Sequence, residues 1–296
     1  MIKRTLYFGN PAYLKTTNDQ LVVERPDLPA HSVPIEDIGL VVLDHQQITI
    51  SQALIAKLLD NNVALITCNQ THHPTGLLLN LDGHTLQSQR FKDQLNSSLP
   101  LRKQLWQQTV EMKIRNQAAA LEQQRINHKY LLRLADTVKS GDSGNYEAKA
   151  ALFYWSRFFP DFLNFTRSRE GAPPNNLLNY GYAIIRAMVA RALVGSGLLP
   201  VMGIHHRNQY NAYCLADDIM EPYRPYVDLL VYQQVRNHGT YLELSPAMKQ
   251  EMLSLPATDV QIDGQTSPMM VAITRTTASL AKCFEGSTRK IVYPII

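Results

Sequence analysis

The feature that most constrains the fold of this chain is a long stretch without glycine, from His84 to Ser140. Beyond Pro100, its apolar residues recur at broadly helical intervals, which is typical of helices that bury one face. These apolar residues are Leu105, Val110, Ile114, Leu121, Tyr130, Leu134 and Val138. The residues before this stretch follow a different pattern, so we expect two regions of different secondary structure.

The first 95 residues predict short strands joined by turns. Residues 9–11 and 17–20 contain Asn, Asp, Gly and Pro, which are typical of tight turns. Ser51 is a suitable N-cap for one short helix. The expected strands occupy residues 5–8, 13–16, 20–24, 39–43, 48–50, 63–67 and 76–79.

Helical patterns dominate the rest of the chain. Gly141 interrupts them, and a later apolar helical run ends at Gly195. At 296 residues the chain exceeds the ~100 to 200 residues of a usual single domain. We therefore predict an α+β protein, with a small, mostly β amino-terminal domain at residues 1–95 and a larger all-α carboxy-terminal domain at residues 96–296.

Charge is distributed unevenly along the chain. Residues 1–99 carry 7 Lys and Arg against 9 Asp and Glu, whereas residues 100–296 carry 22 against 16, which gives the net charge of +4. A basic region attracts polyanions, of which nucleic acid is the commonest. An ordinary solvated surface explains this charge equally well, so composition alone leaves nucleic-acid binding open.

Composition also bears on the cellular compartment. No apolar run approaches the ~20 residues that span a bilayer. The amino end lacks the long apolar segment and the cleavage site of a secretory signal peptide. The cysteines Cys68, Cys214 and Cys283 are scattered and odd in number, which argues against a disulfide framework. We therefore expect a cytoplasmic protein without a membrane segment.

Residues 203–225, GIHHRNQYNAYCLADDIMEPYRP, combine two histidines with three downstream carboxylates. Imidazole and carboxylate together suit a divalent ion of intermediate hardness. Where the backbone is extended, the adjacent His205 and His206 point to opposite sides, so only one is expected to bind a given metal. Both histidines remain candidates on this argument.

The carboxylates of this segment can share one face of a helix. Glu221 follows Asp218 by three residues and Asp217 by four. A buried carboxylate pair repels itself unless a cation or a proton lies between its members. The alternative to a metal is a salt-bridge network in which Arg224 pairs with one of these acids.

Two further groups outside this segment are candidates. Glu147 begins an apolar helical stretch, where an acid either supports the helix dipole or completes a metal site. Arg167 and Arg169 lie in the polar loop at residues 166–176, which is either a phosphate-contacting loop or a plain helix connection.

Four phrases of the sequence resemble a known family, the universal CRISPR-associated adaptation integrases, with the closest resemblance to the versions from type II systems. The phrases are YFGNPAYL at residues 7–14, YEAKAALFYW at 146–155, LNYGYAIIRAMVARAL at 178–193 and GIHHRNQYNAYCLADDIMEPYRPYVD at 203–228. The resemblance covers nearly the whole chain. It implies a β domain followed by a helical domain, in agreement with the periodicity.

The resemblance also implies roles for individual residues. The family's metal ligands are a Glu, a His and a second acid, which fall on Glu147, His206 and Glu221 here, because the family pattern has two residues between the glycine and the ligand. Asp218 and His205 are supporting residues, and the implied metal is Mg²⁺ or Mn²⁺. Arg167, Arg169, Arg186 and Arg207 are candidate contacts to DNA phosphates.

The implied reaction is the insertion of spacer DNA into a CRISPR array, by attack of a 3′-hydroxyl on a repeat-edge phosphodiester. Implied partners are double-stranded DNA, a second copy of the chain bound through the amino-terminal domain, and a small ferredoxin-like adaptation protein. The resemblance to type II systems implies the effector nuclease and a ring-shaped accessory protein as further partners. Two alternatives are a metal-dependent nuclease that joins no strands and a non-catalytic DNA-binding scaffold.

Overall fold

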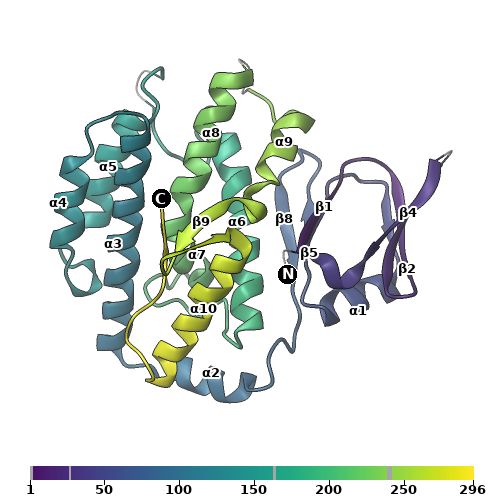
Figure 1. Ribbon diagram of the computed structural model, residues 1–296, viewed down its shortest axis with the longest axis horizontal. Coiled ribbons are helices and arrows are strands. Elements are labelled where there is room, and N and C mark those ends of the chain that lie inside the picture. The colour runs from purple at the N-terminus through teal and green to yellow at the C-terminus, as the bar shows by residue number, and fades with distance from the viewer. Residues whose placement is uncertain (1–2, 27, 163–164, 239–241) are drawn as a thin grey trace.

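The computed structural model describes residues 3–26, 28–162, 165–238 and 242–296, and it has a β-rich region followed by a helical one (Figure 1). This arrangement confirms the predicted α+β fold class. The cysteines Cys68, Cys214 and Cys283 are free, as expected from their number and spacing.

Two four-stranded sheets, one α-helix and a short 3-10 helix make up the described part of the β-rich region. Strands β1, β5 and β7 are parallel and β8 runs antiparallel to β7, whereas the second sheet has the order β4-β3-β2-β6. Ser51 caps the helix as predicted, because its side chain accepts a hydrogen bond from the backbone of Leu54. The elements are β1 (Arg4–Phe8), β2 (Ala12–Thr17), β3 (Gln20–Arg25), β4 (Leu28–Pro34), β5 (Ile38–Leu43), β6 (Ile48–Ile50), α1 (Gln52–Asp60), β7 (Ala64–Cys68) and β8 (Pro74–Leu78).

The sheet that contains β5 is buried on both faces. Leu40 and Val42 point into a core shared with the helices, whereas Val41 points into a second core between this sheet, α1 and the other sheet. Successive side chains of a strand alternate between faces, so a strand buried on both sides is a continuous apolar run. At the end of β5, buried Asp44 accepts a hydrogen bond from Lys249 of α9 at 2.8 Å, which joins the two regions.

The second region is helical, and it also holds a small sheet that the sequence did not predict. Its helices are α2 (Gln87–Leu95), α3 (Leu99–Gln123), α4 (Lys129–Thr137), α5 (Tyr146–Phe158), α6 (Asn175–Gly195), α7 (Cys214–Met220), α8 (Arg224–His238), α9 (Pro246–Met252) and α10 (Met269–Glu285). The short strands β9 (Asp259–Ile262), β10 (Gln265–Pro268) and β11 (Pro294–Ile295) form a sheet of order β10-β9-β11.

Helix α2 lies within the range predicted for the β domain, but its side chains bind the helical region. The Gln94 amide donates to the carbonyls of Leu199 and Met202, both at 3.1 Å, and Arg90 donates to the Ser196 carbonyl at 2.7 Å. By its contacts, α2 is therefore part of the helical region.

Helix α6 runs through the centre of the helical region. By length and composition it could cross a membrane, but 78% of its apolar window is buried inside the structure, as in the core helix of a globular protein. Its side chains include Tyr182 and Arg186, which reach the candidate site described next.

Candidate active site

Glu147 lies in the first turn of α5, and its side chain is not needed to cap that helix. The carboxylate of Asp142 accepts hydrogen bonds from the backbone N–H groups of Tyr146 at 2.8 Å and Glu147 at 3.0 Å. These are two of the N–H groups that a helix start leaves without an internal partner. The Glu147 carboxylate is therefore available for another contact.

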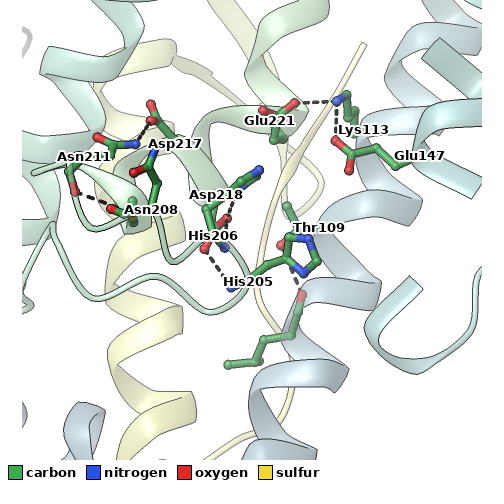
Figure 2. Close-up of polar contacts among 12 residues, drawn as sticks. Thr109, Lys113, Glu147, His205, His206, Asn208, Asn211, Asp217, Asp218 and Glu221 are labelled. Atoms are coloured by element: carbon green, nitrogen blue, oxygen red, sulfur yellow. Dashed lines mark hydrogen bonds and ion pairs between the residues drawn. The ribbon is translucent and has the colours of Figure 1, made fainter. Parts of the chain in front are cut away.

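That contact is Lys113 of α3, whose ammonium lies between two carboxylates (Figure 2). Lys113 Nζ is 2.7 Å from Glu147 Oε1 and 2.6 Å from Glu221 Oε2, and Glu221 Oε1 is 2.9 Å from Arg224 Nε. The exposed fractions of the Lys113 and Glu221 side chains are only 12% and 7%. Glu147 and Glu221 thus converge on one largely buried cation.

Electrostatics favour the charged forms of Glu221 and Lys113. Burial raises the pKa of Glu221, but the positive charges of Arg224 and Lys113 outweigh burial and leave the pKa below its ordinary value. Burial lowers the pKa of Lys113, but Glu221 and Glu147 outweigh it and leave that pKa raised. Arg224, which the salt-bridge alternative paired with one of the acids, binds Glu221, whereas Lys113 was not predicted.

His206 is held by Asp218, a fully buried carboxylate of α7. His206 Nδ1 lies 2.5 Å from Asp218 Oδ1, and Asp218 also accepts hydrogen bonds from the backbone N–H groups of His205 at 2.9 Å and His206 at 3.2 Å. The hydrogen bond to Asp218 is the main cause that raises the pKa of His206. With Nδ1 engaged, Nε2 remains as the nitrogen that can bind a metal.

The loop that carries the two histidines depends on Gly203. A Cβ atom there would lie 2.3 Å from the His206 carbonyl oxygen and 2.8 Å from Asp218 Oδ2. The backbone bends at His205 and is not extended, so the two rings do not point to opposite sides. Both contact Trp106: His205 is stacked on it at 4.2 Å between ring centroids, and His206 meets it edge-on at 5.6 Å.

His205 and Asp217 have other partners. Burial, followed by the charge of His206, lowers the pKa of His205, which fits a ring packed on Trp106. Asp217 binds Arg186 through two hydrogen bonds of 2.6 and 3.1 Å and accepts a third from Asn211 at 2.7 Å. Of the two aspartates of α7, Asp218 therefore supports the histidine and Asp217 holds an arginine.

Beside Glu221 is a cavity of about 230 Å³ whose charged lining is basic. Arg167, Arg169, Arg186 and Arg224 line it, together with Tyr182 and Asn179. Arg167 is fixed by Asn175 at 2.9 Å and Asn179 at 2.7 Å. Guanidinium groups recognise phosphate in pairs of hydrogen bonds, so this cavity, the arginine cavity, suits a phosphate. The predicted Arg207 does not line it.

The residues of the cluster fit a divalent ion. The carboxylates of Glu147 and Glu221 already face one cation, and both raise the pKa of His206, so they lie within electrostatic reach of its imidazole. Carboxylate oxygens with one imidazole nitrogen suit Mg²⁺ or Mn²⁺. Lys113 lies between the two acids, and within the described residues no three His, Cys, Asp and Glu side chains form a group that could already hold a metal.

Comparisons with known proteins bear on the family of this chain. Residues 6–241 match the family model for CRISPR associated protein Cas1. The chain is 36% identical, over 281 residues, to the CRISPR-associated endonuclease Cas1 of Neisseria meningitidis serogroup C, and the match covers 94% of this chain and 91% of that protein.

Among solved structures, two similar ones have low sequence identity and therefore bear on the fold alone. A casposase bound to integration product has a TM-score of 0.80 at 20% identity, and the match covers 98% of this chain and 92% of that one. A chain of a Cas6-RT-Cas1–Cas2 complex has a TM-score of 0.76 at 18% identity, with 98% of this chain and 36% of that one covered.

Proposed function

Since the chain belongs to the Cas1 family of CRISPR-associated proteins, we propose that it is a metal-dependent DNA endonuclease and integrase that inserts spacer DNA into a CRISPR array. One observation carries the proposal: the Glu147 and Glu221 carboxylates converge on a single, largely buried cation, next to His206 and the arginine cavity. The relative with 36% identity is named as an endonuclease, which supports the same class of chemistry.

Glu147, His206 and Glu221 are the residues that would hold the metal. A bound Mg²⁺ or Mn²⁺ neutralises charge on a phosphodiester and lowers the pKa of an attacking hydroxyl group. Asp218 orients the His206 ring through Nδ1, and the stack of His205 on Trp106 holds the same loop. The charges of Lys113 and Arg224 keep Glu221 in the carboxylate form that metal binding requires.

The arginine cavity is the proposed contact for DNA phosphates. Arg167, Arg169 and Arg186 would hold the phosphate next to the reacting one, and hydrogen bonds to neighbouring side chains fix the positions of Arg167 and Arg186. In the reaction, the 3′-hydroxyl oxygen of the spacer forms a bond to the target phosphorus, and the bond from phosphorus to the departing 3′-oxygen breaks. Attack by water in place of this hydroxyl gives cleavage alone.

The proposed partners follow from the family and from the structural relatives. One relative was solved in a complex with Cas2, and another with an integration product. We therefore propose double-stranded DNA, a second copy of this chain and a small Cas2-like adaptation protein as partners. A type II effector nuclease and a ring-shaped accessory protein belong to the same proposal, as does action in the cytoplasm, where the array lies.

A DNA-binding scaffold without catalysis is the second candidate. It is favoured by the Lys113 contacts, because Glu147 and Glu221 already have a positive partner without any metal. The scaffold binds DNA equally well in Mg²⁺ and in chelator, and it joins no strands. A nuclease that never joins strands would need the same metal ligands, so only a joining assay separates it from an integrase.

The deciding experiment is strand transfer of a 3′-hydroxyl DNA fragment into a supercoiled plasmid that carries a CRISPR array, with the Cas2-like protein and Mg²⁺ or Mn²⁺. Joined product is expected from the wild type and from the control His31→Ala, whose exposed histidine lies on β4. It should be lost in chelator and in His206→Ala. Cleavage without joining would favour the simple nuclease, and DNA binding with neither would favour the scaffold.

A further inference from the structure

A second cavity, of about 390 Å³, lies where the β-rich region meets the ends of two helices. Lys3 lies just before β1 and Asn62 just after α1, whereas Arg191 and Gly195 belong to the last turns of α6, and Thr274 and Arg275 to the early turns of α10. No residue lines both this cavity and the arginine cavity. We call it the interdomain cavity.

Arg191 is the most unusual member of its lining. The residue is only 8% exposed, and its Nε donates a hydrogen bond of 2.5 Å to the Asn62 carbonyl. In the part of the chain that the structure describes, no carboxylate lies within ion-pair distance of this guanidinium, and burial lowers its pKa. A buried cation without a counter-ion is costly, so the position favours an anion from outside.

Two more cations face the same space. Burial, followed by the charge of Arg191, lowers the pKa of Lys3, against the opposing effect of Asp37 and Glu36. Arg275 has Gln265 as its side-chain partner, at 3.0 Å, and not an acid. Among the described residues, no Asp or Glu lines the cavity, so its charged lining is entirely positive.

Helix α10 adds to this positive field, because its N-terminal turn borders the cavity. The N-cap residue, Pro268, makes no side-chain cap hydrogen bond, and Pro268, Met270 and Val271 all line the cavity. The first turn of a helix carries partial positive charge and N–H groups that bind anions. The buried Arg191 and this helix start are independent features that favour the same ligand charge.

Besides the cations and the polar residues Asn62 and Thr274, the lining has an apolar wall formed by Ala192, Pro268, Met270 and Val271. The volume lies within the ~300 to 1,000 Å³ of sites for small organic ligands. An inorganic phosphate would leave this apolar wall uncovered. We propose that the interdomain cavity, through Lys3, Arg191 and Arg275, binds a small organic phosphate of about mononucleotide size, with the phosphate on the cations and the organic part on the apolar wall.

Isothermal titration of the full-length protein with AMP, at low salt and in chelator, tests this proposal. We expect one AMP per chain, and binding at least about tenfold weaker in the double variant Lys3→Gln/Arg275→Gln, since each hydrogen bond to a charged group contributes on the order of tenfold. The control Lys290→Gln removes an exposed lysine outside the cavity and should bind AMP as the wild type does. Lys3 and Arg275 are only partly buried, so circular dichroism should show the double variant folded.

Several results would overturn the proposal. One is absence of AMP binding at millimolar concentration, and another is equal affinity for inorganic phosphate. Loss of binding in Arg169→Gln with full binding in the double variant would move the ligand to the arginine cavity. If a short DNA duplex displaced AMP and bound through the same three cations, the cavity would be a site for the DNA backbone. Strand joining is measured separately, so its failure is distinguishable from all of these.

Discussion

Replacement of Lys113 by methionine removes the cation that two carboxylates share, and we expect it to destabilise the protein in a way that metal reverses. Removal of one partner from a buried ion pair costs about 3–5 kcal/mol. Glu221 keeps its contact with Arg224 at 2.9 Å, and the Glu147 side chain is 25% exposed, so the lower end, about 3 kcal/mol, applies. At ~2 °C per kcal/mol for a chain of this size, Tm falls by about 6 °C.

The assay is thermal unfolding of wild type and Lys113→Met in chelator and in MnCl₂. In the wild type, a metal between the two acids must displace the lysine ammonium, whereas in the variant that position is open. Mn²⁺ should therefore raise the Tm of Lys113→Met more than that of the wild type, since a ligand that binds only the folded state stabilises it by mass action. Lys103→Met, an exposed lysine of the same helix, is the matched control.

Two results would refute this reasoning. Equal stability of Lys113→Met and Lys103→Met in chelator would mean that the ammonium contributes nothing to the folded state. Equal Mn²⁺ stabilisation of the wild type and Lys113→Met would mean that Lys113 does not occupy the region where the metal binds.

Three further predictions concern neighbouring groups. Asp218→Asn should weaken Mn²⁺ binding about 10- to 100-fold in a titration, because the carboxylate that orients His206 is lost; unchanged affinity would exclude that role. Burial raises the pKa of Asp228 to about 7, above the ~3.9 of an unfolded chain. Its contribution to folding stability should therefore decrease by up to about 4 kcal/mol as the pH rises from about 4 to 7. Denaturant unfolding against pH should show this fall in the wild type and not in Asp228→Asn, and parallel curves would contradict it. Arg169→Gln should lower DNA affinity and reduce the slope of log affinity against log salt by about 1, whereas Arg207→Gln, outside the arginine cavity, should change it less.

The strands of the first region were predictable because local chemistry encodes them. The apolar run of β5 and the cap at Ser51 can be read without any tertiary contact. Strand β4 was missed because its residues are mostly exposed and include prolines, so that its pairing with β3 is the main evidence for it. Strands β9 to β11 have at most four residues each, too few to show a period.

Some residues of the candidate site could be predicted from the sequence, and others could not. Histidines and acids within one segment, together with Glu147, could be found from their residue types. Lys113 could not, because a lysine in the apolar stripe of α3 acquires a role only when α5 and Glu221 are brought against it. Its one signal is position, since it follows the buried Thr109 and Val110 by four and three residues.

Residue spacing did not separate the roles of Asp217 and Asp218, and only the family resemblance singled out Asp218 as a supporting residue. Both occupy one short helix, and helical spacing allows either to share a face with Glu221. The role of each aspartate depends on its partner elsewhere in the chain. Arg186 of α6 binds Asp217, and the loop at His206 binds Asp218. Such partners depend on how the helices pack, which local patterns do not specify.

We propose that Glu147, His206 and Glu221 form one metal site. A titration with Mn²⁺, in which the electron paramagnetic resonance signal of the free ion is monitored, tests this directly. We expect binding at least about tenfold weaker in Glu147→Gln, His206→Ala and Glu221→Gln, each confirmed as folded. The control Glu111→Gln, on α3 and paired with Arg115, should bind as the wild type does. Unchanged Mn²⁺ affinity in all three site variants would contradict the account.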